Sequence, residues 1–264
     1  MKNITSRLEE IRREGYSLDF SATFTSAFEI YKRMALMGGV AILLVSLLVV
    51  AVGFGAVGLV LGASAFTESI ADFKPTELPA LYLFGYIVGA SLLSALSVPF
   101  TAGLIQMAYE AKHQGEVSLG TAFTHYRSEH FGPLFVAGLI VNVFTMGLSL
   151  GVEFLNNPIA SFVVTLVTAI ISLFLILYIP LIIFGRLPAV EALLTSISLV
   201  ARSPFMILAL VIVATLFSML GLLALCIGVL FTIPFVYATY FVIYDEIVGA
   251  DPDSEIDEIG RADF

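Results

Sequence analysis

Residues 34–62 read MALMGGVAILLVSLLVVAVGFGAVGLVLG and contain no charged side chain. The core of a bilayer offers no water to backbone N–H and C=O groups, so a lipid-embedded chain must satisfy them internally. About 20 residues of helix cross the hydrocarbon. This stretch therefore predicts a transmembrane helix, and the 59% hydrophobic content shows that the rest of the chain has a similar character.

Charged residues are also absent from four further stretches. These stretches lie between Glu77 and Glu110, His130 and Glu153, Glu153 and Arg186, and Arg202 and Asp245. The first three each have room for one span, and the last has room for two. We therefore predict six transmembrane helices, near residues 34–62, 80–108, 132–154, 161–185, 204–222 and 226–246. With five spans, about 20 apolar residues would lack a place of burial unless they formed a re-entrant segment.

Two short motifs recur along the chain and divide it into three similar units. The motifs before the first span of each unit are Ala27-Phe28-x-x-Tyr31-Lys32, Ala122-Phe123-x-x-Tyr126-Arg127 and, in a degenerate form, Ser196-Ile197 with Arg202. The motifs in the second spans are Val98-Pro99-Phe100, Ile179-Pro180-Leu181 and Ile233-Pro234-Phe235. The expected fold is all-α, a polytopic membrane protein of three helical hairpins. Because each unit has two spans, the hairpins point the same way and form a parallel repeat.

An amphipathic stretch precedes the first span of each unit. Phe20, Phe24 and Phe28 recur at the spacing of one helix face, while charged and hydroxyl side chains lie elsewhere. Residues 119–126 and 187–200 are the equivalent stretches. Helices of this kind lie in the plane of the membrane interface. We therefore expect a cytoplasmic in-plane amphipathic helix before each hairpin.

These features predict three regions. Residues 1–33 are expected to form cytoplasmic N-terminal amphipathic helices, and residues 34–247 a six-helix transmembrane domain. Residues 248–264 are expected to form an acidic cytoplasmic tail. The repeat units are expected at about residues 17–110, 117–186 and 187–247.

Lys and Arg residues predict the orientation, because they are held on the cytoplasmic side during insertion. In this topology all of them except Lys74 lie on one side. They are Lys2, Arg7, Arg12, Arg13, Lys32, Arg33, Lys112, Arg127, Arg186, Arg202 and Arg261. The sequence therefore predicts a multi-pass protein with both termini in the cytoplasm.

The net charge of −9 argues against nucleic acid as a partner, because no basic face is present to neutralise phosphates. Much of the acidity gathers near the end of the sequence. These residues are Asp245, Glu246, Asp251, Asp253, Glu255, Asp257, Glu258 and Asp263. Such a run is interpreted as a solvated surface or as a segment that docks a protein partner or a cation. Cys226 is the only cysteine, so one chain contains no disulfide.

The third predicted span carries a stripe of polar residues. Asn142, Thr145, Ser149 and Glu153 follow one another at intervals of three or four and so share one face of a helix. Polar groups are costly in lipid, and this stripe should face the bundle or a wet cavity. One interpretation is hydrogen bonding between helices. The other is the wall of a solute path.

Three prolines interrupt the even-numbered spans. Pro99, Pro180 and Pro234 each remove a backbone donor and free the carbonyl four residues earlier. Such a carbonyl, in the membrane, can coordinate a cation or line a cavity. The alternative is a kink that lets the hairpins pack.

No cofactor or metal site is expected. His113, His125 and His130 share one connection, but their spacing does not match zinc ligands on a helix, which stand three or four residues apart. The letters of a dinucleotide motif at residues 53–58 lie inside an uncharged span rather than between a strand and a helix. No nucleophile, base and orienting group converge, which favours a non-enzymatic protein.

The segments Phe20–Phe24, Tyr31-Lys32, Tyr240–Glu246 and Ile256–Gly260 resemble an uncharacterised family of six-span membrane proteins found in Bacteroidota and related bacteria. The family has an amphipathic start, a proline in its last span and a short polar tail. The tail is more acidic here. The resemblance implies a location in the bacterial inner membrane and supplies no functional residues.

Three hypotheses for the function follow. The first is a non-enzymatic membrane protein that organises lipid, or docks a protein partner, through its cytoplasmic amphipathic helices. The second is a transporter or channel for a small solute or lipid, with a path along the third span and the proline kinks. The third is an intramembrane enzyme acting on lipids, which would require acids or histidines brought together by folding.

Overall fold

The computed structural model describes residues 4–61, 76, 79–155, 157–223 and 227–250, and the regular structure in these residues is helical throughout. The elements are α1 (Ile4–Glu14), α2 (Phe20–Leu61), α4 (Ala80–His113), the 3-10 helix η2 (Leu119–Tyr126), α5 (Phe131–Glu153), α6 (Pro158–Phe174), α7 (Tyr178–Ile183), α8 (Ala189–Val200), α9 (Pro204–Leu220), the 3-10 turn η3 (Gly221–Leu223), α10 (Ile227–Thr232) and α11 (Pro234–Ile247). Among the described residues, six helical stretches are long and apolar enough to cross a membrane. The predicted all-helical class with six candidate spans is confirmed.

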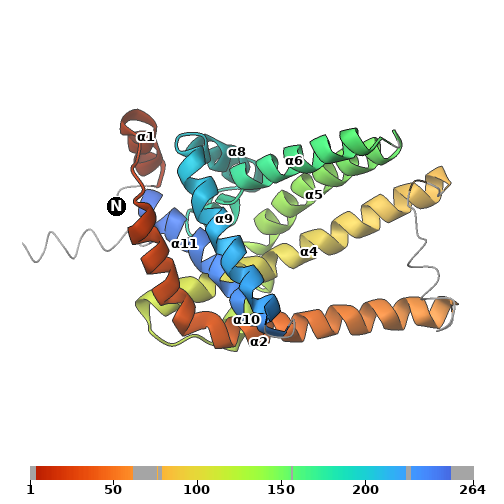
Figure 1. Cartoon of the computed structure of the whole chain (residues 1–264), viewed down its shortest axis with the longest axis horizontal. Coiled ribbons are helices and arrows are strands. Elements are labelled where there is room, and N and C mark those ends of the chain that lie inside the picture. Colours follow the sequence, from red (N-terminus) through yellow and green to blue (C-terminus); the bar gives the residue numbers. More distant parts are fainter. Residues whose placement is uncertain (1–3, 62–75, 77–78, 156, 224–226, 251–264) are drawn as a thin grey trace, which may run out of the picture.

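The predicted boundary between an amphipathic helix and the first span is not a break in the helix. Residues 20–61 form the single helix α2. Figure 1 shows that its first part, in red, runs at an angle to the orange remainder. Glycine pairs permit such bends, and a Cβ atom on Gly39 would lie 2.3 Å from Cδ1 of Phe231. The sequence between the two parts contains no proline or cap that would stop the helix. The helix therefore continues and bends.

The prolines act differently in the three even-numbered spans. Pro99 lies inside α4, which continues through it. The fourth span breaks between α6 and α7, just before Pro180. The sixth span breaks between α10 and α11, and Pro234 begins α11. Pro is well accommodated in the first turn of a helix, where its missing N–H would have no partner anyway.

The prolines also separate two zones of different exposure. Before Pro99, α4 exposes large apolar side chains such as Leu81 and Leu93, which are 78% and 72% exposed. After Pro99, Leu104 and Ile105 are fully buried. An extended exposed apolar surface is unfavourable in water and is the expected surface of a helix in lipid. We call the region before the prolines, with its exposed apolar side chains, the lipid-facing zone. The region around and after the prolines, with its buried side chains, is the packed zone.

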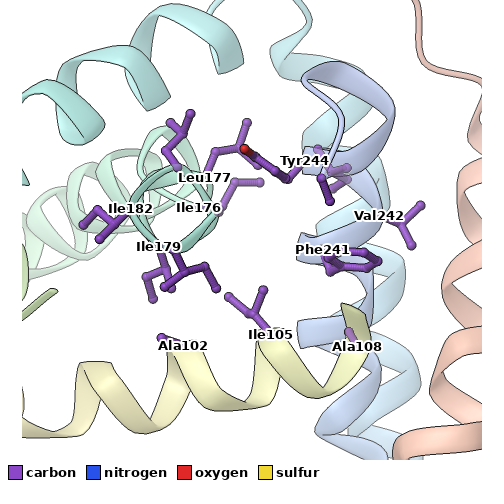
Figure 2. Close-up of a cluster of buried hydrophobic side chains, with 14 of the residues drawn as sticks. Ala102, Ile105, Ala108, Ile176, Leu177, Ile179, Ile182, Phe241, Val242 and Tyr244 are labelled. Carbon is purple, nitrogen blue, oxygen red and sulfur yellow. The ribbon is translucent and has the colours of Figure 1, made fainter. Parts of the chain in front are cut away.

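The packed zone is built from the segments around and after the three prolines. Figure 2 shows a cluster of buried side chains from α4, from the α6–α7 junction and α7, and from α11. The labelled residues are Ala102, Ile105, Ala108, Ile176, Leu177, Ile179, Ile182, Phe241, Val242 and Tyr244. Full burial of an Ile or Phe side chain contributes about 1.5–3 kcal/mol, so this cluster is a major source of stability.

Each segment that precedes a hairpin packs against a proline-bearing span. The ring of Phe123 in η2 lies 5.8 Å from that of Phe100, directly after Pro99. The ring of Phe28 in α2 lies 6.2 Å from that of Phe235, directly after Pro234. Helix α8 contacts α7. These contacts place the start of α2 on the last span and so bring the two ends of the described chain together.

Hydrogen bonds hold these segments at the edge of the packed zone. Thr121 donates to Glu110 (Oγ1–Oε2, 2.7 Å), and Thr23 donates to Glu246 (Oγ1–Oε2, 2.5 Å). Lys112 forms an ion pair with Asp245. The sequence assigned Asp245 and Glu246 to a solvated acidic run, but both lie in α11 and carry specific contacts. The rest of that run, residues 251–264, lies outside the described residues.

Gly103 provides a test of this packing. A Cβ atom there would lie 2.1 Å from the carbonyl oxygen of Ala122, whereas nothing lies within 4 Å of a Cβ on Gly89 in the same helix. Gly103→Ala is expected to lower the free energy of unfolding by about 1–3 kcal/mol. Gly89→Ala should leave it unchanged or raise it by up to about 1 kcal/mol, because Ala favours helix. Thermal unfolding in detergent measures both. Equal effects of the two substitutions would contradict the packing.

Candidate functional site

A polar cleft of about 560 Å³ lies between α4, α5 and α6. Figure 1 shows α5 and α6 side by side, with α4 running below them. Its wall combines hydroxyl, amide and apolar groups. The lining residues are Tyr86, Ala90, Ser91 and Ser94 of α4, Val141, Asn142, Thr145, Met146 and Ser149 of α5, and Thr168 and Ser172 of α6. No charged residue is among them. The cleft therefore suits a neutral ligand with hydrogen-bonding groups.

The predicted stripe on the third span provides one wall of this cleft. Asn142, Thr145 and Ser149 all line it, because intervals of three and four residues keep them on one face of α5. Glu153 is the last residue of α5; it is exposed and does not line the cleft. The structure thus brings together three of the four residues of the stripe.

Part of the stripe is used in contacts between helices. Ser94 of α4 donates to Asn142 Oδ1 (2.7 Å), and Asn142 Nδ2 donates to the carbonyl of Gly138 (2.8 Å). Ser91 lies 3.8 Å from the sulfur of Met146. These bonds hold α4 against α5 and orient the Asn142 amide. The interpretation as hydrogen bonding between helices and the interpretation as a cleft wall therefore apply to the same residues.

Several polar groups in the cleft can still form hydrogen bonds with a ligand. The Asn142 amide has a second N–H beyond the one bonded to Gly138. Ser149 and Ser172 make no side-chain hydrogen bond to another described residue. Thr145 and Thr168 donate to carbonyls of their own helices, and their oxygens can still accept. The cleft therefore presents both donors and acceptors.

The cleft is closed on the side of the packed zone. A Cβ atom on Gly138 would lie 2.6 Å from Cγ2 of Val98 and 3.4 Å from Cα of Ala95. This close approach of α5 to α4 leaves no room for a solute between them. Beyond it lies the buried cluster of Figure 2. The cleft is thus a pocket with one blocked end.

The three prolines lie in the packed zone and do not line the cleft. Near each of them a hydroxyl from another segment bonds to the backbone. Tyr126 donates to the carbonyl of Leu96 (2.8 Å), next to Ala95, whose carbonyl has no helical donor because of Pro99. The structure therefore favours the packing interpretation of the prolines at these positions.

The second break is spanned by a buried serine. Ser196 of α8 donates to the carbonyl of Phe174 (2.8 Å) and accepts from the N–H of Leu177 (3.2 Å), so one hydroxyl satisfies both sides of the α6–α7 break. At the third break, Thr232 donates to the carbonyl of Ser218 (2.6 Å), and the hydroxyl of Ser218 lies 3.0 Å from the carbonyl of Thr232. Sequence reasoning identified the prolines but missed these partners, because the partners come from other segments.

The histidines of the second connection do not form a metal site among the described residues, where no three His, Cys, Asp or Glu side chains gather. His125 is 5% exposed, and its ring lies 5.8 Å from that of His130. Its Nδ1 is 3.3 Å from the hydroxyl of Ser128, and its Nε2 has no partner in the described structure. Burial, and secondarily His130, lower the pKa of His125 to about 4.

Cys226 and Lys74, which the sequence analysis singled out, lie outside the described residues.

Comparison of the chain with protein-family models, with curated proteins and with solved structures finds no match.

The buried His125 predicts a pH dependence of stability. Its pKa falls from 6.5 to about 4 on folding, so protonation favours the unfolded chain. This contribution to stability is complete above pH 6.5 and decreases as the pH falls toward 4. His125→Gln should reduce the loss of thermal stability over this interval, measured in detergent. The exposed His113 provides the control, and an equal pH slope in wild type and His125→Gln would show the prediction to be wrong.

Proposed function

We propose that this chain is a non-enzymatic, multi-pass inner-membrane protein that binds a neutral, hydroxyl-bearing membrane amphiphile in the cleft between α4, α5 and α6. One observation carries the proposal. Uncharged donors and acceptors from three helices face a cleft that is open among lipid-facing helices and blocked toward the packed zone. A diacylglycerol or a neutral glycolipid has the matching chemistry, with hydroxyls for the polar wall and acyl chains for the lipid-facing zone.

The depth of the cleft supports an amphiphile as ligand. Helix α5 has 23 residues, or about 34 Å of helix, which matches a hydrocarbon core of about 30 Å. Asn142 lies about 16 Å from the start of α5, near the middle of the core. Ser149 lies about 27 Å along it, near the far interface. The polar wall thus runs from mid-membrane to one surface, where a lipid head group enters.

The proposal includes the topology predicted from the sequence. Both termini are cytoplasmic, as the distribution of Lys and Arg indicates. The three hairpins form a parallel repeat that closes into a ring. What supports this is the repetition of one contact: Phe123 packs on Phe100 just as Phe28 packs on Phe235. In each pair a pre-span aromatic meets the residue that follows a proline.

A cytoplasmic partner protein is a further part of the proposal. Helix α8 is apolar on both sides: Ala192, Leu193 and Leu199 are buried, while Val190 and Leu194 are exposed. An amphipathic surface helix would present one polar side, whereas the exposed side of α8 combines Val190, Leu194 and Ile197 with one acid, Glu191. Its exposed side faces either the membrane interface or such a partner.

Substitution of Asn142 tests whether the cleft binds a neutral lipid. Asn142→Leu keeps the size of the side chain and removes its donors and acceptor, so retention of diacylglycerol should fall about tenfold. Native mass spectrometry of protein from nanodiscs containing diacylglycerol measures the retained lipid. Thr165→Val is the matched control, because Thr165 bonds to Ser161 of its own helix and does not line the cleft. Unchanged retention in Asn142→Leu would refute the proposed site.

The alternative is a transporter for a small neutral solute or a lipid. The observation that favours it is the direction of the stripe, which runs from Asn142 toward the exposed Glu153 at the end of α5. This function requires the contact of Gly138 with α4 to open. Glycerol flux into proteoliposomes should then fall in both Asn142→Leu and Glu153→Gln. Flux equal to that of empty vesicles in the wild type would exclude transport and leave the binding function untouched.

A further inference from the structure

A second cleft, also of about 560 Å³, lies over η2 at the edge of the packed zone. It is lined by Gly120, Phe123, Thr124, Tyr126 and Arg127. These residues supply a cation, a hydroxyl and two aromatic rings that are 40% and 38% exposed. We propose that this cleft binds the phosphate head group of an anionic phospholipid, with Arg127 as the charged contact. This site is independent of the neutral ligand proposed for the first cleft.

Arg127 lies at the right depth for a lipid phosphate. Helix α5 begins at Phe131, shortly after Arg127, and its length of about 34 Å fits one crossing of the hydrocarbon. The start of α5, and with it Arg127, therefore lies at the level of the head groups. Tyr side chains are enriched at this level, where an apolar ring with a polar hydroxyl meets the head groups. Tyr126 lines the cleft together with Arg127.

Arg127 also differs from the other cations that follow the pre-span motifs. Lys32 pairs with Glu29 (2.7 Å). Arg33 donates to the carbonyl of Ala111 (3.0 Å), and Arg202 donates to the carbonyl of Arg12 (2.6 Å). Within the described part of the chain, Arg127 has no ion pair and no side-chain hydrogen bond.

No acid in the described ranges forms an ion pair with Arg127. Glu129, the nearest acid in the sequence, lies 3.9 Å from Nε2 of His130. Glu110 accepts from Thr121. A guanidinium held at the interface without a carboxylate attracts an anion, and its planar donors match two phosphate oxygens.

Hydrogen bonds hold the lining of the cleft against α4. Tyr126 is fixed to α4 through the carbonyl of Leu96 (2.8 Å), and Thr121 is fixed through Glu110 (2.7 Å). The backbone of Ala122 rests on Gly103, where no side chain intervenes. Because η2 is already ordered, little conformational entropy is lost on binding. The Thr124 hydroxyl donates to the carbonyl of Gly120 (3.5 Å), so the donors for the phosphate come from the guanidinium of Arg127.

Competition between lipids tests the site. The full-length protein is reconstituted in nanodiscs of phosphatidylcholine with phosphatidylglycerol, and native mass spectrometry counts the phosphatidylglycerol that remains bound. Arg127→Gln should retain about fivefold less phosphatidylglycerol than wild type. Lys32→Gln, which alters the corresponding but paired cation of the first unit, should retain as much as wild type.

Three results would overturn the proposal. They are wild-type retention of phosphatidylglycerol by Arg127→Gln, equal losses in Arg127→Gln and Lys32→Gln, and displacement of the bound lipid by inorganic phosphate, which would assign the site to a soluble anion. Arg127→Lys keeps the charge and should retain more phosphatidylglycerol than Arg127→Gln. Thermal unfolding of each variant confirms that it is folded. Loss of diacylglycerol in Asn142→Leu is measured separately, so one site can fail while the other holds.

Discussion

The structure depends on how backbone groups are satisfied where prolines interrupt membrane helices. In an apolar medium an unpaired N–H or C=O costs several kcal/mol, and each proline removes one donor from the helical ladder. Tyr126, Ser196 and the pair of Ser218 and Thr232 supply hydroxyl bonds at or next to these interruptions. Two of these side chains come from segments that lie outside the candidate spans. The surface segments therefore cannot be separated from the transmembrane helices without exposing backbone groups.

This requirement explains the division into two zones. Around the prolines, side chains of neighbouring segments must approach closely, and Gly103 and Gly39 allow this approach by lacking a Cβ atom. The result is the buried cluster of α4, α7 and α11 (Figure 2). Away from the prolines, α4, α5 and α6 expose apolar side chains, and the polar cleft lies between these three helices.

In the proposed placement of the chain in the bilayer, the two clefts lie at different depths, and this accounts for their different chemistry. The cleft at Asn142 has no charged residue in its lining, as expected for a site that reaches the middle of the membrane, where a charge is costly. In the same placement the cleft at Arg127 lies at the head-group level, where a cation is solvated and can meet an anion. A neutral amphiphile and an anionic phospholipid are therefore assigned to different places on one protein.

The sequence by itself determined the helical class, the six apolar stretches and the placement of Asn142, Thr145 and Ser149 on one helix face. Length, charge and periodicity are local properties, and lipid makes them decisive. Only the tertiary structure decided that α2 continues through residue 33, that the prolines lie in packing contacts, that Glu153 is outside the cleft and that Arg127 is unpaired among the described residues. Each of these depends on a side chain or backbone group from a distant segment. Sequence spacing contains no information on which distant segments meet.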